Sequence, residues 1–174
     1  MAIALGSCSS TVTKRTARIE GAIAVVPLTK GYVAVIDAAD VGSVRGHSWQ
    51  VVEAGRCVYA AATIGGKRVY LHRHIMAAPV GIEVDHRNGN GLDCRRSNIR
   101  LATPTQNRQN KGLTAQNRSG MKGASWNANA GKWEANIRAA GNRHYLGLFE
   151  TALAAHEAYA HAARELHGDF ARVA

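Results

Sequence analysis

Short runs of apolar residues, separated by Gly and polar residues, recur between positions 32 and 71. They occur at Tyr32–Ile36, Trp49–Val52, Val58–Ile64 and Lys67–Leu71. Gly65 and Gly66 separate the last two runs, and a two-glycine spacer is typical of a hairpin turn. The pattern predicts a small β region over residues 19–70, behind a flexible, Ser/Thr-rich tail at residues 1–18.

The next segment predicts a helix followed by a pair of strands. Leu71–Ala78 is expected to form a short helix that Pro79 stops. Val80–Asp85 and Ile99–Ala102 are expected to be partner strands on either side of an Asn/Gly-rich loop at residues 87–93.

A strong helix start follows at Thr103. Pro104 occupies the first helical position and Gln106 the third, which is where a capping box places it. The helix is predicted to run to about Lys111 and to end at Gly112.

In the last third of the chain, the apolar residues have the spacing of three strands followed by the spacing of a helix. After a polar linker at residues 113–119, strands are predicted at Gly123–Trp126, Lys132–Arg138 and His144–Phe149. Thr151 is expected to cap a helix that Gly168 ends. Its apolar positions step by three and four: Ala152, Ala155, Tyr159, Ala162 and Leu166. The whole chain is therefore predicted to be α+β.

Composition suggests several small cores. Hydrophobic residues make up 46% of the 174 residues, but aromatic residues only 6%, and Ala and Val carry much of the rest. No apolar run approaches the length that spans a bilayer, and no secretory signal is recognisable. The three cysteines are far apart, which argues against a disulfide framework or a four-cysteine zinc site. We expect an intracellular protein in a reducing cytoplasm, the bacterial host's if a phage encodes it.

Charge points to a polyanionic partner. The formal net charge is +10, and eight Lys or Arg residues but no Asp or Glu lie between Asp93 and Glu134. Such a stretch attracts nucleic acid by releasing condensed counterions. A solvated, solubilising surface is the alternative.

The chemistry concentrates around Asp85 and His86. A neutral histidine can act as a general base near neutral pH. Asp85 and the amide oxygen of Asn107 are hard ligands suited to Mg²⁺. Asn110 lies one helical turn beyond Asn107 and competes with it for the ligand role, while Asn98 is either a loop-locking residue or a plain turn former.

Residues from about Tyr70 to Lys111 resemble an HNH nuclease of the ββα-metal type, in the His-Asn-Asn variant of phage homing endonucleases. The motifs that carry the likeness are Leu71-His72-Arg73, Val84-Asp85-His86, Gly89-Asn90, Ser97-Asn98-Ile99-Arg100 and Asn107. The resemblance implies a nuclease module at residues 71–112, with catalytic residues Asp85, His86 and Asn98. It also implies one Mg²⁺ or Mn²⁺ ion held by Asp85 and Asn107, since Asn in place of a third His disfavours Zn²⁺.

Several residues in this module keep two interpretations. His72 packs under the site or contacts phosphate, and Arg73, Arg87 and Arg100 clamp phosphates or are merely solvated. Cys94, with Arg95 and Arg96, departs from the family pattern and is interpreted as loop variation outside the metal site.

Residues 120–174 resemble the plant-type apetala/ethylene-response-factor DNA-binding domain. The likeness runs through Ser119–Trp126, Lys132–Ile137, Leu146–Phe149, Ala154–Tyr159 and His167-Gly168. It implies a three-stranded sheet that lies in the major groove, on one packed helix. The expected DNA contacts are Lys122, Trp126, Lys132, Arg138, Arg143 and Tyr145. Strand alternation puts Trp133 with Ala135 and Ile137 on the helix side, so Trp133 is expected to be a core residue.

The N-terminal residues Val26–Tyr70 look like the small β segment that often precedes phage HNH nucleases. The combined expectation is a metal-dependent DNA endonuclease, monomeric or weakly dimeric, that leaves 3′-hydroxyl and 5′-phosphate ends. It would act as a site-specific nickase or a double-strand cutter. The alternatives are a catalytically inactive, sequence-specific DNA-binding protein, and an RNA-directed protein, which a major-groove sheet suits poorly.

Overall fold

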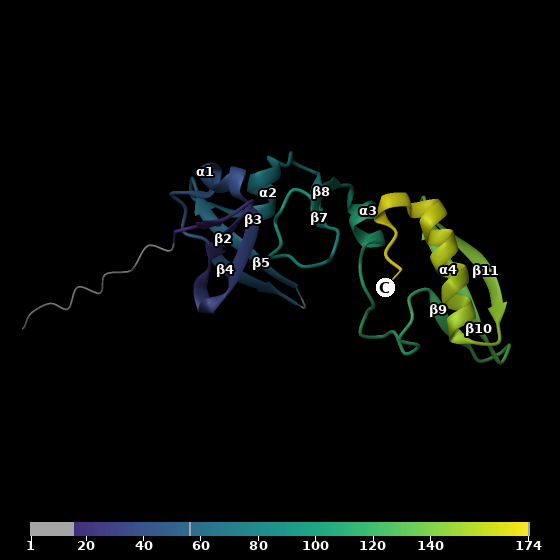
Figure 1. The fold of residues 1–174 in the computed structure, drawn as a ribbon. Coiled ribbons are helices and arrows are strands. Elements are labelled where there is room, and N and C mark those ends of the chain that lie inside the picture. Colours follow the sequence, from purple (N-terminus) through teal and green to yellow (C-terminus); the bar gives the residue numbers. More distant parts are fainter. Residues whose placement is uncertain (1–15, 56, 174) are drawn as a thin grey trace, which may run out of the picture.

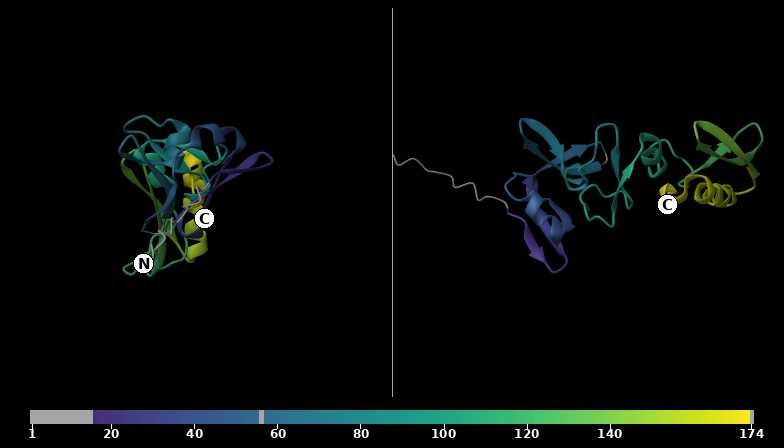
Figure 2. Two further views of the ribbon diagram at one scale, coloured as in Figure 1. Left: turned by 90° about the vertical axis from the view of Figure 1, so that its left-hand side faces the viewer. Right: turned by 90° about the horizontal axis from the view of Figure 1, so that it is seen from above.

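The computed structural model describes residues 16–55 and 57–173, so most of the predicted tail lies outside the described residues. The chain has an elongated shape, with an N-terminal β body, a central strand pair and short helix, and a C-terminal sheet and helix in succession (Figures 1 and 2). Small sheets and helices mix as the α+β prediction requires.

The first sheet has the order β1-β2-β3, with strands β1 (Arg18–Glu20), β2 (Ile23–Pro27) and β3 (Val33–Asp37). All its pairs are antiparallel, and alternate residues of β2 and β3 are buried. Because Arg18 begins β1, the predicted tail ends earlier than residue 18. The 3₁₀ turn η1 (Thr29–Gly31) joins β2 to β3, and the 3₁₀ turn η2 (Ala38–Asp40) and the helix α1 (Val41–Val44) follow β3. None of the three was predicted.

The second sheet has the order β4-β5-β6, with strands β4 (Gln50–Ala54), β5 (Cys57–Ile64) and β6 (Lys67–Tyr70). The predicted Gly65-Gly66 hairpin turn joins β5 to β6, and both glycines have positive φ. The helix α2 (Leu71–Met76) follows directly. Ala77, in the left-handed conformation, ends it before Pro79.

The central module consists of β7 (Glu83–His86), β8 (Ile99–Ala102) and α3 (Pro104–Gln109). The capping box is present, since the Thr103 side chain accepts from the Gln106 amide and the Gln106 side chain accepts from the Thr103 amide. The helix is slightly shorter than predicted, with Asn110 as its C-cap.

One cluster of buried side chains runs from the N-terminal sheets into this module. Ala24, Ile36 and Leu71 share it with Val84 and Ile99. The long loop between β7 and β8 is also fixed to β3, because Val35 exchanges backbone hydrogen bonds with Leu92 and Cys94. The boundary predicted at residues 70/71 therefore cuts through a continuous core.

The C-terminal unit is a sheet of order β11-β10-β9 packed on one helix. Its strands are β9 (Ala124–Asn127), β10 (Lys132–Ala139) and β11 (Asn142–Phe149), and its helix is α4 (Ala152–His167). Thr151 caps α4 by accepting from the Ala154 amide. Small residues let the helix lie close to the sheet: Ala155 and Ala163 are fully buried.

The C-terminal end of α4 differs from the predicted pattern. Leu166 is 45% exposed, so its predicted place in the apolar stripe was wrong; His167 is buried at that end of the helix instead, with Nε2 2.9 Å from the Arg138 carbonyl oxygen. After α4 the turn η3 (Gly168–Phe170) brings the chain back beside α3 (Figure 1).

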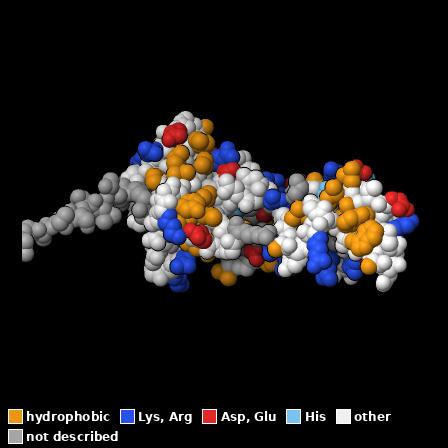
Figure 3. All heavy atoms as spheres, turned by 90° about the horizontal axis from the view of Figure 1, so that it is seen from below, with side chains coloured by type: hydrophobic (Ala, Val, Ile, Leu, Met, Phe, Trp, Pro, Cys, Tyr) orange, Lys and Arg blue, Asp and Glu red, His pale blue; other side chains and the backbone are white. Residues whose placement is uncertain are grey.

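Within the described residues, no helix has both the length and the apolar character needed to cross a membrane. Basic side chains are visible over both the N-terminal and the C-terminal halves on the face seen from below (Figure 3). The cationic character inferred from the sequence is therefore not confined to one module.

Candidate active site

The site begins where β7 ends. Asp85 lies opposite Arg100, and His86 lies opposite Ile99, in the antiparallel β7–β8 pair. Both Asp85 and His86 are buried, at 4% and 6% exposure, and both line one cleft of about 190 Å³. Because the strand stops at His86, the two side chains reach the same cleft although they are neighbours in sequence.

The loop between the two strands is held by Asn98. Its Nδ2 donates to the Asp93 carbonyl at 2.8 Å and to Asn88 Oδ1 at 3.0 Å, and its Oδ1 accepts from the Asn88 amide at 3.1 Å. Asn98 is 8% exposed, so water does not compete for these bonds. The contacts are those of a residue that fixes the loop shape; a role in catalysis stays a prediction.

The Asp85 carboxylate is neutralised by Arg100. Nη2 of Arg100 lies 2.6 Å from Asp85 Oδ2, and Nε lies 2.8 Å from the same oxygen. Asn110 Nδ2 donates to both carboxylate oxygens, at 2.8 and 3.1 Å, and to the His86 carbonyl oxygen at 2.8 Å. All three side chains are buried. A carboxylate so deep in the protein requires a cation, and here the guanidinium provides it.

The same guanidinium is held from its other side by the C-terminal segment. The Phe170 ring lies over Arg100, with 3.7 Å between Cζ and the ring centroid. Arg100 Nη1 also donates to the Asp169 carbonyl oxygen at 2.5 Å. The end of the chain therefore takes part in placing the cation that faces Asp85.

Helix α3 brings Asn107 to the cleft that Asp85 and His86 line. The Nδ2 of Asn107 donates to Glu83 Oε2 at 2.5 Å, and Glu83 is the first residue of β7. This bond uses the amide nitrogen as donor, which leaves the amide oxygen available as an acceptor.

The rings of His72 and Tyr59 lie beside His86. His72 approaches edge-on at 4.8 Å between centroids, and Tyr59 lies 6.0 Å away. Burial lowers the pKa of His86, although Asp85 and Asp93 partly oppose the shift. Burial, with His86 nearby, lowers the pKa of His72 from 6.5 to about 3, and burial raises the pKa of Tyr59 to about 12. All three rings are therefore uncharged at neutral pH.

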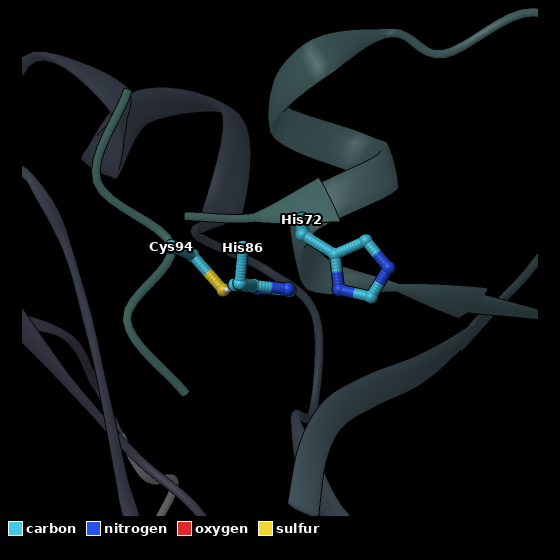
Figure 4. A group of neighbouring side chains, drawn as sticks. All are labelled: His72, His86 and Cys94. Atoms are coloured by element: carbon cyan, nitrogen blue, oxygen red, sulfur yellow. Dashed lines mark hydrogen bonds between the residues drawn. The ribbon is translucent and has the colours of Figure 1, made fainter. Parts of the chain in front are cut away.

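Cys94 lies against this histidine pair, contrary to its interpretation as loop variation outside the site. Its Sγ is 4.0 Å from His86 Nε2 and 3.8 Å from the Gly91 carbonyl oxygen. Cys94 is fully buried, and burial raises the pKa of its thiol to about 12. Figure 4 shows Cys94, His86 and His72 converging from the loop, β7 and α2.

The donor types in the cleft are those that hard divalent ions prefer. A carboxylate and a carboxamide oxygen are the hard ligands that Mg²⁺ and Mn²⁺ prefer, and a neutral imidazole beside them can take a proton. The buried Asp85 already requires a positive charge next to it, and Arg100 supplies that charge here. The arrangement can therefore bind a cation and activate a water molecule in one place.

The three arginines predicted as phosphate clamps differ from one another. Arg87 is exposed at the mouth of the loop. Arg73 donates to the carbonyl oxygens of Ile82, Ala78 and Pro79, so it fixes the turn before β7. Arg100 is 9% exposed and paired with Asp85. Neither Arg73 nor Arg100 is free for phosphate in this conformation.

The predicted contacts in the C-terminal sheet fall on different faces. Trp126 pairs directly with Trp133, which faces the helix, so Trp126 lies on the helix side although it is 55% exposed. Trp133 packs against the buried cluster around Ala135, as expected of a core residue. Arg138 pairs with Arg143, and Tyr145 with Asn136, on the opposite, outward face.

Ion pairs occupy part of that outward face, and Lys122 is not on it. Lys132 pairs with Glu150, and Arg143 pairs with Glu134. Lys122 Nζ donates to the carbonyl oxygens of Gln109 and Lys111, and burial lowers its pKa to about 8. It therefore joins the C-terminal unit to the end of α3.

Three residues of the site carry no motif that sequence reasoning used. Glu83 holds Asn107, Phe170 covers Arg100, and Arg172 lines the cleft. Glu83 lies two positions before Asp85 on the same strand, so strand alternation was an available signal. Phe170 and Arg172 lie more than 60 residues from the motif, and only the folded chain brings them there.

Comparison with known proteins gives one family. The HNH endonuclease family model matches residues 69–109. Over 94 residues the chain is 36% identical to Protein 3.8 of Escherichia phage T7, covering 54% of this chain and 77% of the relative. Over 148 residues it is 32% identical to the uncharacterized HNH endonuclease L560 of Acanthamoeba polyphaga mimivirus, covering 82% and 74%. No solved structure matches the chain.

Proposed function

This chain belongs to the HNH endonuclease family, and we propose that it is a divalent-metal-dependent endonuclease that hydrolyses phosphodiesters in double-stranded DNA. The observation that carries the proposal is the shared cleft. Asp85 and His86 from β7 meet Asn107 from α3 there, so hard oxygen ligands and a neutral imidazole face one space.

In the proposed reaction His86 takes a proton from water as the water oxygen attacks phosphorus. Asp85 and Asn107 would hold a Mg²⁺ or Mn²⁺ ion, which would supply positive charge next to the phosphate and the leaving oxygen. Asn98 fixes the loop under the site through its bonds to Asn88 and Asp93. The bond from phosphorus to the 3′ oxygen breaks, and that oxygen takes a proton from solvent, which leaves 3′-hydroxyl and 5′-phosphate ends.

In the proposed reaction Arg100 balances the charge of Asp85. Its guanidinium neutralises Asp85, and it would share the charge of this carboxylate with a bound metal ion. Asn110 stays a donor to Asp85 and to the His86 carbonyl oxygen, so it positions the carboxylate while Asn107 acts as ligand.

We propose that the C-terminal unit reads the DNA sequence. Its resemblance to apetala/ethylene-response-factor domains agrees with a three-stranded sheet whose one face is covered by α4 and whose other face is open. Arg138, Arg143 and Tyr145 lie on the open face, with Lys132 at its edge. Because two of these three cations, Lys132 and Arg143, are paired with Glu150 and Glu134, DNA phosphates would compete with carboxylates for them.

Three further features belong to the proposal. The protein works in the cytoplasm of the cell that holds its DNA target. It acts as a monomer or a weak homodimer. One active site per chain makes nicking of a single strand the simplest outcome, and double-strand cutting would require two nicks.

The deciding experiment is cleavage of supercoiled plasmid in the presence of Mg²⁺. The wild-type protein should nick it, and His86→Ala should be at least about 100-fold slower, which is the usual contribution of a general base. The matched control is His161→Ala, which changes an exposed histidine on α4 and should cut at the wild-type rate. Equal cutting by His86→Ala and wild type would refute the assignment.

The cut ends and the metal ligand are tested in the same assay. Nicks with 3′-hydroxyl and 5′-phosphate ends are resealed by DNA ligase without prior treatment, and any other ends are not. Asn107→Ala should raise the Mg²⁺ concentration needed for half-maximal cutting, because one ligand is lost.

One observation favours a second candidate, a sequence-specific DNA-binding protein that does not cut. Asp85 is fully engaged by Arg100 and Asn110 in this structure. If that arrangement persists on DNA, the protein should retard a specific DNA fragment in Mg²⁺, Mn²⁺ or Co²⁺ and leave both strands intact.

A further inference from the structure

Three potential metal ligands lie together beside the proposed oxygen site. His72 comes from α2, His86 from β7 and Cys94 from the loop, and their ligand atoms all lie within 4.8 Å of one another (Figure 4). All three side chains are buried. A tetrahedral zinc site places such atoms roughly 3.3 to 3.6 Å apart, given metal distances of about 2.0 Å to nitrogen and about 2.3 Å to sulfur. Side-chain rotations that move the ligand atoms by about 1 Å would bring them to the separations of a zinc site.

One atom of this cluster is buried and unsatisfied. Two buried side-chain atoms have no hydrogen-bond partner among the described residues, His72 Nδ1 in this cluster and His167 Nδ1 in the C-terminal unit. Most buried polar atoms in proteins have a hydrogen-bond partner, because a buried atom without one destabilises the fold. Aromatic packing explains the position of the ring between Tyr59 and Tyr70, but it leaves the nitrogen unpaired.

The donor types separate this cluster from the neighbouring oxygen ligands. Two imidazoles and a thiol are the ligands of Zn²⁺, Co²⁺ and copper, whereas Asp85 and Asn107 offer the oxygens that Mg²⁺ prefers. The two sets meet at the adjacent residues Asp85 and His86. Asp85 with Asn107, and His72 with His86 and Cys94, therefore favour different metals, although each group takes one ligand from β7.

The three side chains have the lone pairs that a metal ion needs. Each neutral imidazole offers the lone pair of one ring nitrogen. The Cys94 thiol carries its proton in the absence of metal. On binding, the S–H bond breaks, the proton passes to water, and both sulfur electrons of that bond go to the new bond with the metal.

We propose that His72, His86 and Cys94 form a binding site for a thiophilic divalent ion such as Zn²⁺, and that its occupation switches off the nuclease. A neutral imidazole has one free lone pair. Once His86 gives that pair to a metal ion, it can no longer take a proton from water. The binding stands on the cluster alone, while the inhibition rests on the proposed nuclease function.

Binding is tested with Co²⁺ as the probe, on the full chain in its reduced, chelator-free form. A Cys-ligated tetrahedral Co²⁺ ion gives a thiolate-to-metal charge-transfer band and intense visible bands. Wild type should show both at one equivalent of Co²⁺, and Zn²⁺ should abolish them. Cys57→Ser, which removes an exposed thiol, is the matched control and should keep the bands. Cys94→Ser should lose the charge-transfer band, and His72→Ala should weaken the visible bands.

The proposal is overturned if wild type shows no such bands at one equivalent, which requires no variant to fold. It is also overturned if folded Cys94→Ser, judged by circular dichroism, keeps the charge-transfer band.

The switch is tested by the ratio of nicking rates without and with Zn²⁺ at saturating Mg²⁺. This ratio should be at least about tenfold smaller for Cys94→Ser than for wild type and Cys57→Ser, and an unchanged ratio would overturn the inhibitory role. A protein that binds Co²⁺ through Cys94 but never cuts DNA would refute the nuclease function and leave the metal site standing. A protein that cuts DNA but shows no Co²⁺ bands would refute the metal site and leave the nuclease function standing.

Discussion

Arg100 and Asp85 lie opposite each other in the β7–β8 pair and form a buried ion pair, with 2.6 Å between Nη2 and Oδ2. The pair links the fold to the proposed chemistry, because a buried carboxylate keeps its charge only beside a cation. A metal ion at Asp85 would place positive charge beside the carboxylate, as Arg100 does in this structure. Stability and metal binding should therefore be coupled at this residue.

Arg100→Gln tests that coupling. Removing the guanidinium leaves Asp85 buried without its cation and should cost about 3 to 5 kcal/mol of unfolding free energy in the presence of EDTA. Adding Mg²⁺ should raise the melting temperature of Arg100→Gln more than that of wild type. Arg96→Gln, which breaks a pair with Asp40 outside the cleft, is the control and should show the wild-type Mg²⁺ response. The same Mg²⁺ shift in both variants would contradict a cation site at Asp85.

Asn98→Ala should loosen the loop between β7 and β8. The variant leaves the Asp93 carbonyl oxygen and the Asn88 amide without the partners they have in the folded chain. We expect a loss of about 1 to 3 kcal/mol, measured by urea denaturation, together with slower nicking. Asn129→Ala, in the exposed turn between β9 and β10, should change neither quantity. Unaltered stability in Asn98→Ala would show that the loop is held by other contacts.

His72 should make the protein sensitive to acid. Its pKa is 6.5 in an unfolded chain and about 3 in the folded protein, since burial disfavours the charged ring. Between these pH values the unfolded chain binds a proton that the folded protein does not, so stability falls as the pH falls from 6.5 towards 3. The slope from this group is at most about 1.4 kcal/mol per pH unit. Above pH 6.5 it contributes no pH dependence.

Urea denaturation of His72→Phe across that pH range, with a chelator present, checks the argument. The variant should lose stability less steeply than wild type below pH 6.5. His161→Gln alters an exposed histidine and should keep the wild-type slope. Parallel curves for His72→Phe and wild type would place the acid sensitivity elsewhere.

Arg138→Ala should weaken DNA binding. Arg138 lies on the face of the C-terminal sheet that α4 does not cover, and it is exposed. A plot of the logarithm of affinity against the logarithm of salt concentration has a slope set by the number of phosphate contacts. If Arg138 contacts a phosphate, its loss should reduce the magnitude of this slope by about one. Arg164→Ala, on the exposed side of α4, should leave that slope as it is. The measurement is fluorescence anisotropy over a salt series, and equal slopes for the two variants would exclude the sheet as the DNA-binding face.

Local signals predicted much of the fold. The Thr103–Gln106 capping box, the Gly65-Gly66 turn and the Thr151 cap each act within a few residues, so their outcome depends little on the rest of the chain. The short strands β1 and β2 and the helix α1 lack such signals. The core shared with β3 stabilises β2 and α1, and β1 is held by its backbone pairing with β2. Neither a core made by distant residues nor a strand pairing is visible locally.

The site was predictable in its motif and not in its surroundings. Asp85, His86 and Asn107 were expected to meet, and they line one cleft. The contact of Cys94 with His86 depends on the path of the loop, which backbone bonds to Val35 fix. Lys122 was expected at DNA because it is cationic, but packing between the C-terminal unit and α3 buries half of it.

The return of the chain to Arg100 has a geometric consequence. The C-terminal unit is joined to the nuclease module through residues 113–119, and it is fastened again where Phe170 covers Arg100. A body attached at two points swings far less than one on a single tether. If the sheet reads bases and the cleft cuts DNA as proposed, the separation between the bases read and the bond cut should therefore be constant, and the cut should fall a fixed number of base pairs from the recognition sequence.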